Sequence, residues 1–420
     1  MSQHRIRVVL TLIALIFSAT AANAQRTPPP QDPAKPKIRA ITAFVSLDRS
    51  KYQQQVADAM KTLKYARTVL ESRGYVVQTV RIATQPFSEY TKGLSTEQTV
   101  EFFRNYEALA EQQQFLASIG PAMLNANDPE TQADVLAEIL AGTKSINASL
   151  VVASEDGIRW RSVGAAARII KRLEDTERSQ ANFRFAAIAM VPPLTPFFPA
   201  AYLSGFGHQF AIALESANTV AAVFKDSQDL NTARQKLTET LAKTAFDIEG
   251  LAQRIDRDTG WAYVGMDLSP APMKDISIGA ALEDLTQQPF GSSGTLTAAA
   301  TLTAAIRDVH VKRTGYNGLM IPILEDERLA QRWSEGNISI DGLLSYSAVC
   351  GTGLDTVPLP GDVTEQQLDL IIGDMASLAF KWKKPLSARL LPVANKAAGE
   401  TTDFDDPALV NATIQPLTHR

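Results

Sequence analysis

The chain has 420 residues, of which 45% are apolar and 20% charged, a balance typical of a globular protein with a substantial core. Its 41 lysine and arginine residues are interleaved with 45 aspartate and glutamate residues, and the net charge is −4. Because there is no basic stripe, the sequence argues against a nucleic-acid partner and against binding to an anionic membrane surface. The single cysteine, Cys350, excludes an intramolecular disulfide, so we expect the hydrophobic core alone to stabilise the fold.

The first 24 residues have the pattern of a secretory signal peptide. A positively charged start precedes an apolar run at 8–17, and the segment ends in the small-residue cleavage pattern Ala22-Asn23-Ala24. The apolar run is shorter than the roughly 20 residues that a membrane helix needs. No cysteine stands at the cleavage site, so a lipid anchor is excluded. We therefore expect removal of residues 1–24, a periplasmic or secreted protein, and no stable membrane anchor afterwards.

The sequence of the mature chain predicts a linker, one large domain and a tail. Residues 25–37 are rich in proline and predict an extended linker. In the following part we expect strands at 38–47, 75–82, 150–153, 183–190, 261–268, 318–324 and 386–393, and helices at 52–72, 95–117, 129–142, 229–257, 278–286, 295–309 and 364–380. Residues 339–349 fit either a helix or a strand. No linker interrupts 38–397, which we take as one α/β domain with a largely parallel sheet covered by helices, followed by a polar tail at 398–420.

The stretch from Cys350 to Asp362 is the leading candidate for a functional site, because ligands in parallel α/β folds gather at loops beside strand ends. We read it as a glycine-rich loop, in which Gly351 and Gly353 could expose backbone N–H groups to an anion. The other residues expected to line this site are Thr352, Asp355 and Asp362. A thiol beside such a loop could serve as a nucleophile, whereas a free cysteine is also commonly a small buried residue. Both interpretations of Cys350 stay open.

Three further stretches could contribute to a site. Gly291-Ser292-Ser293-Gly294 opens a predicted helix, where free N–H groups could bind a carboxylate or phosphate, or where the serines could simply cap the helix. Asp267 and Glu325 end predicted strands and could exchange protons or hold Mg²⁺ or Ca²⁺, although a helix N-terminus is the commoner place for an acid such as Glu325. Residues 190–202 contain four prolines and predict a stiff apolar loop, which forms a pocket wall or packs on the barrel end. Four scattered histidines argue against zinc, and the cofactor stays undecided, with a divalent cation as one option.

Five stretches in chain order carry a resemblance to a known family, namely 183–200, 267–280, 290–299, 314–326 and 350–362. They include Thr195-Pro196-Phe197-Phe198-Pro199-Ala200, Asp267-Leu268-Ser269-Pro270-Ala271-Pro272 and Phe290-Gly291-Ser292-Ser293-Gly294. From Ile38 to Asn411 the chain resembles the domain of unknown function 711 family, also called uncharacterised protein family 0210. The resemblance implies a large single-domain α/β barrel similar to that of pyruvate formate-lyase-like glycyl radical enzymes, with helices outside and a loop inserted in the barrel. It also makes the Cys350 stretch the counterpart of the inserted finger loop.

Two functions from different classes follow from these observations. In the first, the protein is an enzyme for a small acidic metabolite, with Cys350, Asp267 and Asp355 around one cavity. The tail after residue 397 has no Arg-Val-x-Gly-Tyr-type radical glycine, so this enzyme would work without a glycyl radical. In the second, the same pocket only binds a small ligand, as in an exported carrier or sensor. A homo-oligomer is compatible with either function.

Overall fold

The computed structural model describes residues 35–417, so the expected signal peptide and residues 25–34 of the expected linker lie outside the described part. Ten strands form one sheet, with β5 paired to β4 and the other nine in the order β8-β7-β1-β2-β3-β4-β6-β10-β9. The strands are β1 Lys37–Val45, β2 Val77–Thr84, β3 Leu116–Ala122, β4 Ile146–Ser154, β5 Gly157–Ile158, β6 Phe185–Ala189, β7 Gln209–Glu215, β8 Ala262–Asp267, β9 Gly353–Pro360 and β10 Leu386–Val393.

The sheet closes into a barrel through a segment that is not itself a strand. Strands β1, β2, β3, β4 and β6 run parallel, whereas β7 is antiparallel to β1 and β10 is antiparallel to β6. The outermost strands β8 and β9 run parallel to β7 and β10. Isolated parallel bridges then join Met266 of β8 to Arg313, and Asp355 of β9 to Pro322. Residues 313–322 therefore connect the two edges of the sheet.

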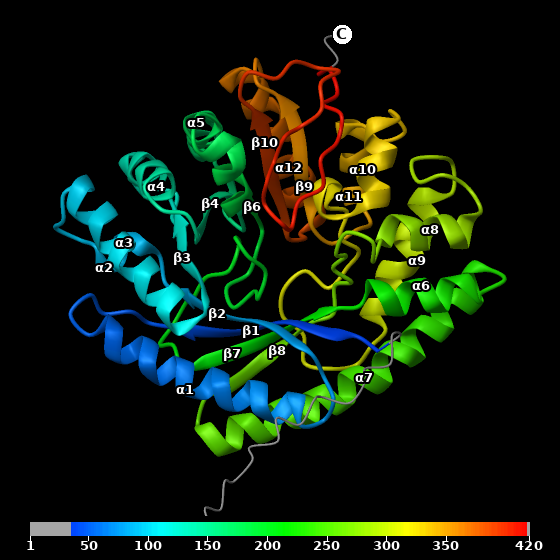
Figure 1. Ribbon diagram of the computed structural model, residues 1–420, viewed down its shortest axis with the longest axis horizontal. Helices are drawn as coiled ribbons and strands as arrows, with labels where there is room; N and C mark the ends of the chain where they lie inside the picture. The colour runs from blue at the N-terminus through cyan, green and yellow to red at the C-terminus, as the bar shows by residue number, and fades with distance from the viewer. Residues whose placement is uncertain (1–34, 418–420) are drawn as a thin grey trace, which may run out of the picture.

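The helices surround this barrel on its outside (Figure 1). They are α1 Tyr52–Glu71, α2 Phe87–Tyr90, α3 Thr96–Gln113, α4 Thr131–Ala141, α5 Trp160–Glu174, α6 Ala217–Lys225, α7 Leu230–Thr259, α8 Ile278–Thr286, α9 Thr295–Arg307, α10 Glu327–Ser334, α11 Ile340–Ser347 and α12 Glu365–Trp382. Local sequence explains several starts: Ser95 and Gln98 form a capping box at α3, and the Asp229 carboxylate accepts two backbone N–H groups at α7. No helix within residues 35–417 is both long enough and apolar enough to cross a membrane.

Alternate residues of the strands pack on opposite faces of the barrel wall, as the twofold period of a strand requires. Ile41 of β1 and Ile82 of β2 belong to the large core under the helices. Phe44 and Ala83 of the same strands belong to a separate cluster inside the barrel. The small Ala211 of β7 is in this inner cluster too, and such small inward-facing side chains leave room for a further segment within the barrel.

That segment is the proline-rich loop between β6 and β7. Its residues Phe198, Ala201 and Leu203 belong to the inner cluster of Phe44 and Ala83, and Phe197, Ala200 and Tyr202 belong to a second cluster with Val151 and Ile188. Figure 1 shows it in green at the centre of the ring of strands. The Ser118 hydroxyl donates to the carbonyl of Ala201 (2.8 Å), and the Leu203 N–H donates to the carbonyl of Thr84 (2.9 Å). The structure thus confirms a loop inserted in an α/β barrel with helices outside.

Two predictions about local structure are wrong. The stretch from Cys350 to Asp362 is not a loop, because Gly353–Pro360 is strand β9, paired with β10. Hence it is not the inserted loop either. Residues 318–324 are not a strand, because they make isolated bridges and end in a short 3₁₀ turn, Ile323–Glu325. Strands β3 and β7 and helix α6 were not predicted, whereas the helices at 52–72, 278–286 and 295–309 and the strand at 386–393 are confirmed with small shifts in bounds.

The C-terminal segment lies against the domain, although its composition is polar. Phe404, Leu409, Ala412 and Ile414 are buried in the large core. The Val410 N–H donates to the carbonyl of Leu324 at 2.7 Å. Residues 398–417 therefore stabilise the end of the segment that closes the barrel.

Candidate functional site

A buried ion-pair network lies inside the barrel, on β9, β10 and the 3₁₀ turn. Arg389 of β10 contacts Asp355 of β9, with Nε to Oδ1 at 2.5 Å, and it also donates through Nη2 to Glu325. The other Glu325 oxygen accepts from Arg39 of β1 at 3.2 Å. The side chains of Arg389, Glu325 and Asp355 are at most 7% exposed. Four side chains from distant parts of the sequence are therefore joined where solvent screening is weak.

The electrostatics of this network act differently on its two carboxyl groups. Burial opposes ionisation of Glu325, but Arg389 and Arg39 outweigh burial and lower the pKa of that carboxyl group. Burial raises the pKa of Asp355, and Arg389 counteracts this rise. For Arg389, burial is also the largest influence, yet the two carboxylates outweigh it and raise the guanidinium pKa. Arg389 thus holds two buried carboxylates at once.

Arg81 of β2 differs from the other inner arginines because no carboxylate pairs with it. Its Nε donates to the Thr79 hydroxyl at 3.0 Å, and its guanidinium lies 4.9 Å from the centre of the Phe198 ring. Among residues 35–417 its two Nη atoms have no hydrogen-bond partner, although the residue is only 7% exposed. Burial lowers the pKa of Arg81 to about 9, with smaller contributions from Arg39 and Arg389, and the attraction of Glu325 opposes this fall, so the group is still a cation at neutral pH. A cation without an ion pair of its own is therefore buried in the barrel, which ordinarily costs stability.

Arg39 and Arg81 line a narrow cavity together with Asp267 and Ser269. The remaining walls are Pro196, Phe197, Ala213, Leu214, Ala271 and Met320. The space open to the centre of a water molecule is about 10 Å³, which is room for about one water. A larger occupant therefore requires the lining side chains to move.

Asp267, at the end of β8, is held in this wall by hydrogen bonds. Its Oδ1 accepts from the backbone and hydroxyl of Ser269 (3.0 and 2.6 Å) and from the Asn317 N–H (3.2 Å), and its Oδ2 accepts from the Tyr316 N–H (2.9 Å). Burial raises the pKa of Asp267, and these hydrogen bonds oppose the rise. The carboxyl group thus fixes the turn that follows residue 313 and also faces the cavity.

The structure joins two of the predicted site residues, Glu325 and Asp355, through Arg389, and places Asp267 in a cavity wall that it shares with Arg39. It does not bring Cys350 to them. Cys350 is fully buried and packs in the large apolar core under the helices, to which Asp355 does not belong. Its carbonyl accepts from the Lys384 ammonium group, which also donates to the Ser347 carbonyl at 2.8 Å. This placement matches the alternative in which Cys350 is a buried structural residue.

The two predicted glycine sites lie elsewhere and make close backbone contacts. A Cβ atom on Gly353 would lie 2.4 Å from the Ser387 carbonyl oxygen, and one on Gly291 would lie 2.0 Å from that of Asn337. A Cβ atom on Gly351 would lie 2.9 Å from the backbone of Gly318, and the Gly351 N–H donates to the Leu319 carbonyl. The Gly291-Ser292-Ser293-Gly294 turn stands at the start of the outer helix α9, while Thr352 is buried and Asp362 is exposed after β9. None of these residues lines the cavity at Arg81.

Sequence reasoning missed the arginines, although a signal was present. Arg39, Arg81 and Arg389 each interrupt an otherwise largely apolar strand segment. A charged residue in such a strand indicates a buried partner or ligand, since isolated buried charges are costly. For metals, no group of three or more histidine, cysteine or acidic side chains in residues 35–417 is arranged to hold an ion.

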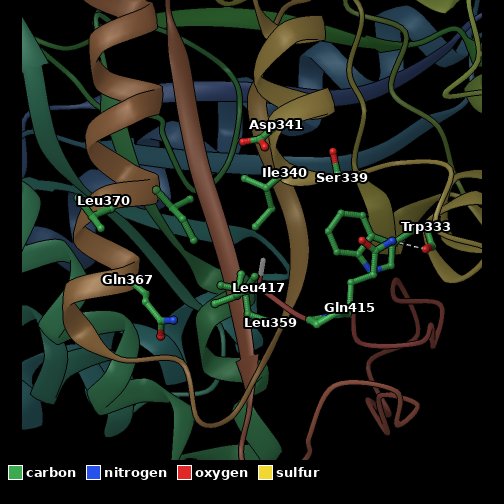
Figure 2. Close-up of a pocket in the computed structure, with 11 residues that line it drawn as sticks. Trp333, Ser339, Ile340, Asp341, Leu359, Gln367, Leu370, Gln415 and Leu417 are labelled. Atoms are coloured by element: carbon green, nitrogen blue, oxygen red, sulfur yellow. Dashed lines mark hydrogen bonds between the residues drawn. The ribbon is translucent and has the colours of Figure 1, made fainter. Parts of the chain in front are cut away.

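A second hollow lies at the surface between α11, α12, the end of β9 and the C-terminal segment. Its volume is about 360 Å³. Figure 2 shows Gln367 and Leu370 on α12 at one side of it and Trp333 at the other. Asp341 is the only titratable residue among its lining residues, so this hollow offers no cation that could bind an acid. It also contains none of the site residues that the sequence predicted.

The fold is an α/β barrel with a loop inserted in it. Solved structures with a similar arrangement include the anaerobic ribonucleotide reductase from Thermotoga maritima, in complex with dATP and CTP (TM-score 0.40, 10% identity, 89% of this chain and 79% of that one). The same enzyme with MES in its active site has a TM-score of 0.43 at 9% identity, over 90% of this chain and 81% of that one. At these values the likeness concerns the fold alone.

The family follows from the sequence comparison. Residues 32–406 match the family described as Uncharacterised ACR (DUF711), and the chain belongs to this family. A UPF0210 protein of Pyrobaculum islandicum is 30% identical over 87% of this chain and 85% of its own length. One from Pyrobaculum arsenaticum is 34% identical over 64% of this chain and 62% of its own length. One from Oenococcus oeni is 25% identical over 91% of both chains.

Proposed function

We propose that this protein binds a small acidic molecule inside its barrel, at Arg81 and Arg39. The observation that carries the proposal is the Arg81 guanidinium, which is buried, charged and without a carboxylate partner in residues 35–417, and which lines a cavity. A bound anion would supply the missing partner through charge-assisted hydrogen bonds. Of the residues predicted to be catalytic, only Asp267 lines this cavity, so binding is better supported than catalysis through Cys350.

Ligand entry would use the tip of the inserted loop. Residues 196–200 make no hydrogen bond to the barrel wall in the described part of the chain, and Phe197 and Phe198 contact it through their rings. Pro196 and Phe197 line the cavity. Opening the tip would expose the buried rings of Phe197 and Phe198, so its cost is lost apolar burial and not broken hydrogen bonds. Displacement of this tip would widen the cavity without breaking the sheet.

Saturating anions should stabilise the purified protein, and this stabilisation should depend on Arg81. A ligand at one hundred times its Kd adds about 2.7 kcal/mol to the free energy of unfolding, which is a readable rise in Tm. Replacing Arg81 with glutamine should weaken binding about 10- to 100-fold, the value of one or two charge-assisted hydrogen bonds. The measurement is a thermal-shift screen of short carboxylates and inorganic phosphate at constant ionic strength.

The matched control is Arg161→Gln, because Arg161 is an exposed arginine on α5 whose partner is Glu130. It should retain the full anion-dependent shift. If no anion stabilises the wild type, or if Arg81→Gln responds as strongly as the control, the proposed binding site is wrong.

We further propose that the barrel acts outside the cytoplasm. The support is the N-terminal pattern that ends in Ala22-Asn23-Ala24. Expressed with its own N-terminus in a bacterium, the protein should appear in the periplasm or medium with Gln25 as its first residue. The intact mass of the fractionated protein and the mass of its N-terminal peptide test this, with Gln25 read either as glutamine or as pyroglutamate, and an intact N-terminus in the cytosolic fraction would contradict export.

A further inference from the structure

The charges inside the barrel limit what the cavity can hold. Arg39, Arg81 and Arg389 carry three positive charges, and two of these are matched by Glu325 and Asp355. Arg81 has no such ion pair in residues 35–417. Asp267 stands in the same cavity wall, and its carboxyl group offsets part of the positive charge there. The cavity therefore suits a single negative charge better than a dianion.

The shape of the free donors points to a planar anion. The Nη atoms of Arg81 have no hydrogen-bond partner in residues 35–417, while its Nε is occupied by Thr79. A guanidinium fork matches the two oxygens of a carboxylate in one plane. Tetrahedral oxyanions such as phosphate gain most when several cations surround them, but the charge of Arg39 is already shared with Glu325.

The rest of the cavity wall is apolar. Beyond the two arginines, Asp267 and Ser269, all the lining residues are apolar. Each methylene group transferred from water to such a wall contributes about 0.8 kcal/mol, which is about a fourfold change in affinity. The free space is small, but Met320 is flexible and Phe197 belongs to the loop tip that lacks hydrogen bonds to the wall. A short hydrocarbon chain therefore enters only if Met320 and Phe197 move aside.

From these three features we infer that the ligand is a monocarboxylate with a short apolar chain, its carboxylate on Arg81 and its chain against Phe197, Ala271 and Met320. This inference rests on the proposed function and narrows it to one chemical class. Arg39, the other cation in the cavity wall, is already paired with Glu325, so the second charge of a dicarboxylate or of phosphate would have to compete with that carboxylate.

The test is isothermal titration of the purified protein with acetate, propionate, butyrate, malonate and inorganic phosphate at constant ionic strength. Affinity should increase about fourfold for each methylene from acetate to butyrate. Malonate and phosphate should bind at least tenfold more weakly than propionate. If phosphate or malonate binds as tightly as propionate and the binding needs Arg81, the proposed function stands but the monocarboxylate inference is wrong. If no anion binds, both are wrong.

Two variants test separately how the carboxylate and the hydrocarbon chain of the ligand contribute to binding. Ala271→Val narrows the apolar part, so butyrate should lose at least tenfold in affinity while acetate changes by less than twofold. Arg81→Lys keeps the charge but removes the planar fork, and it should weaken all three monocarboxylates by about the same factor. Circular dichroism establishes that each variant is folded. Equal losses for acetate and butyrate in Ala271→Val would overturn the placement of the chain, and unchanged binding in Arg81→Lys would overturn the role of the fork.

Discussion

Replacing Arg389 with methionine should lower the free energy of unfolding by about 3–5 kcal/mol, because it leaves two buried carboxylates without their shared cation. Glu325 and Asp355 are both less than 10% exposed, and Arg389 bridges them. Glu325 would retain Arg39, whereas Asp355 has no other ion pair in residues 35–417. The loss should be measured by urea denaturation at pH 7 as a lower midpoint with an unchanged slope.

The pH dependence of this variant gives an independent check. In the wild type the pKa of folded Glu325 is lowered, so its contribution to stability is present above its unfolded pKa and is lost as the pH falls through the lower folded value. Without Arg389 the folded pKa of both carboxyl groups should rise. The loss in free energy of unfolding, relative to the wild type, is therefore largest at neutral pH. The difference between variant and wild type should therefore shrink below about pH 4, near the ordinary carboxyl pKa.

Arg172→Met is the matched control for this experiment. Arg172 also forms a two-pronged contact, with Glu138, but both side chains are nearly half exposed. Exposed pairs of this kind contribute about 0–1 kcal/mol. If Arg389→Met lowers the free energy of unfolding by no more than Arg172→Met does, the buried ion-pair network does not stabilise the barrel.

The class of fold could be predicted from the sequence because it depends on local patterns. The helix of residues 52–71 and the strand of residues 386–393 show the periodicity of their type, and the structure places both within a few residues of the predicted bounds. Strand β9 was missed because Gly351 and Gly353 suggest a loop. In the structure these glycines permit backbones to approach closely, since a Cβ on Gly353 would meet the Ser387 carbonyl.

The site was harder to predict because its partners are distant in the sequence. The carboxylates Asp267 and Glu325 could be selected because they follow apolar runs. The arginines that pair with Glu325 could not be predicted, because Arg389 is 64 residues from it in the sequence and Arg39 is 286 residues from it. Cys350 attracted attention as the only thiol, but a free cysteine is often a small apolar residue, and its position in the core agrees with that role.

Replacing Arg81 with methionine should have the opposite effect from the change at Arg389, and it should stabilise the ligand-free protein by about 1–3 kcal/mol. The variant removes a buried cation that has no carboxylate partner, and it keeps an apolar side chain to pack against Phe198. The variant also loses the hydrogen bond to Thr79, which offsets about 0.5–1.5 kcal/mol of the increase in the free energy of unfolding. Urea denaturation without added anion should show a higher midpoint, and the same variant should no longer respond to carboxylates.

Arg184 supplies the comparison that decides between a functional and a structural arginine. It is as deeply buried as Arg81, but its guanidinium donates to the backbone carbonyls of Leu140, Thr143 and Ile146. Arg184→Met should therefore destabilise the protein, because three buried acceptors lose their donor. A higher free energy of unfolding in Arg81→Met, together with a lower one in Arg184→Met, would mean that Arg81 lowers the stability of the barrel. Such a cost is expected of a group that is retained to bind a ligand. If both changes destabilise the protein to the same extent, Arg81 is part of the scaffold and the anion site has no basis.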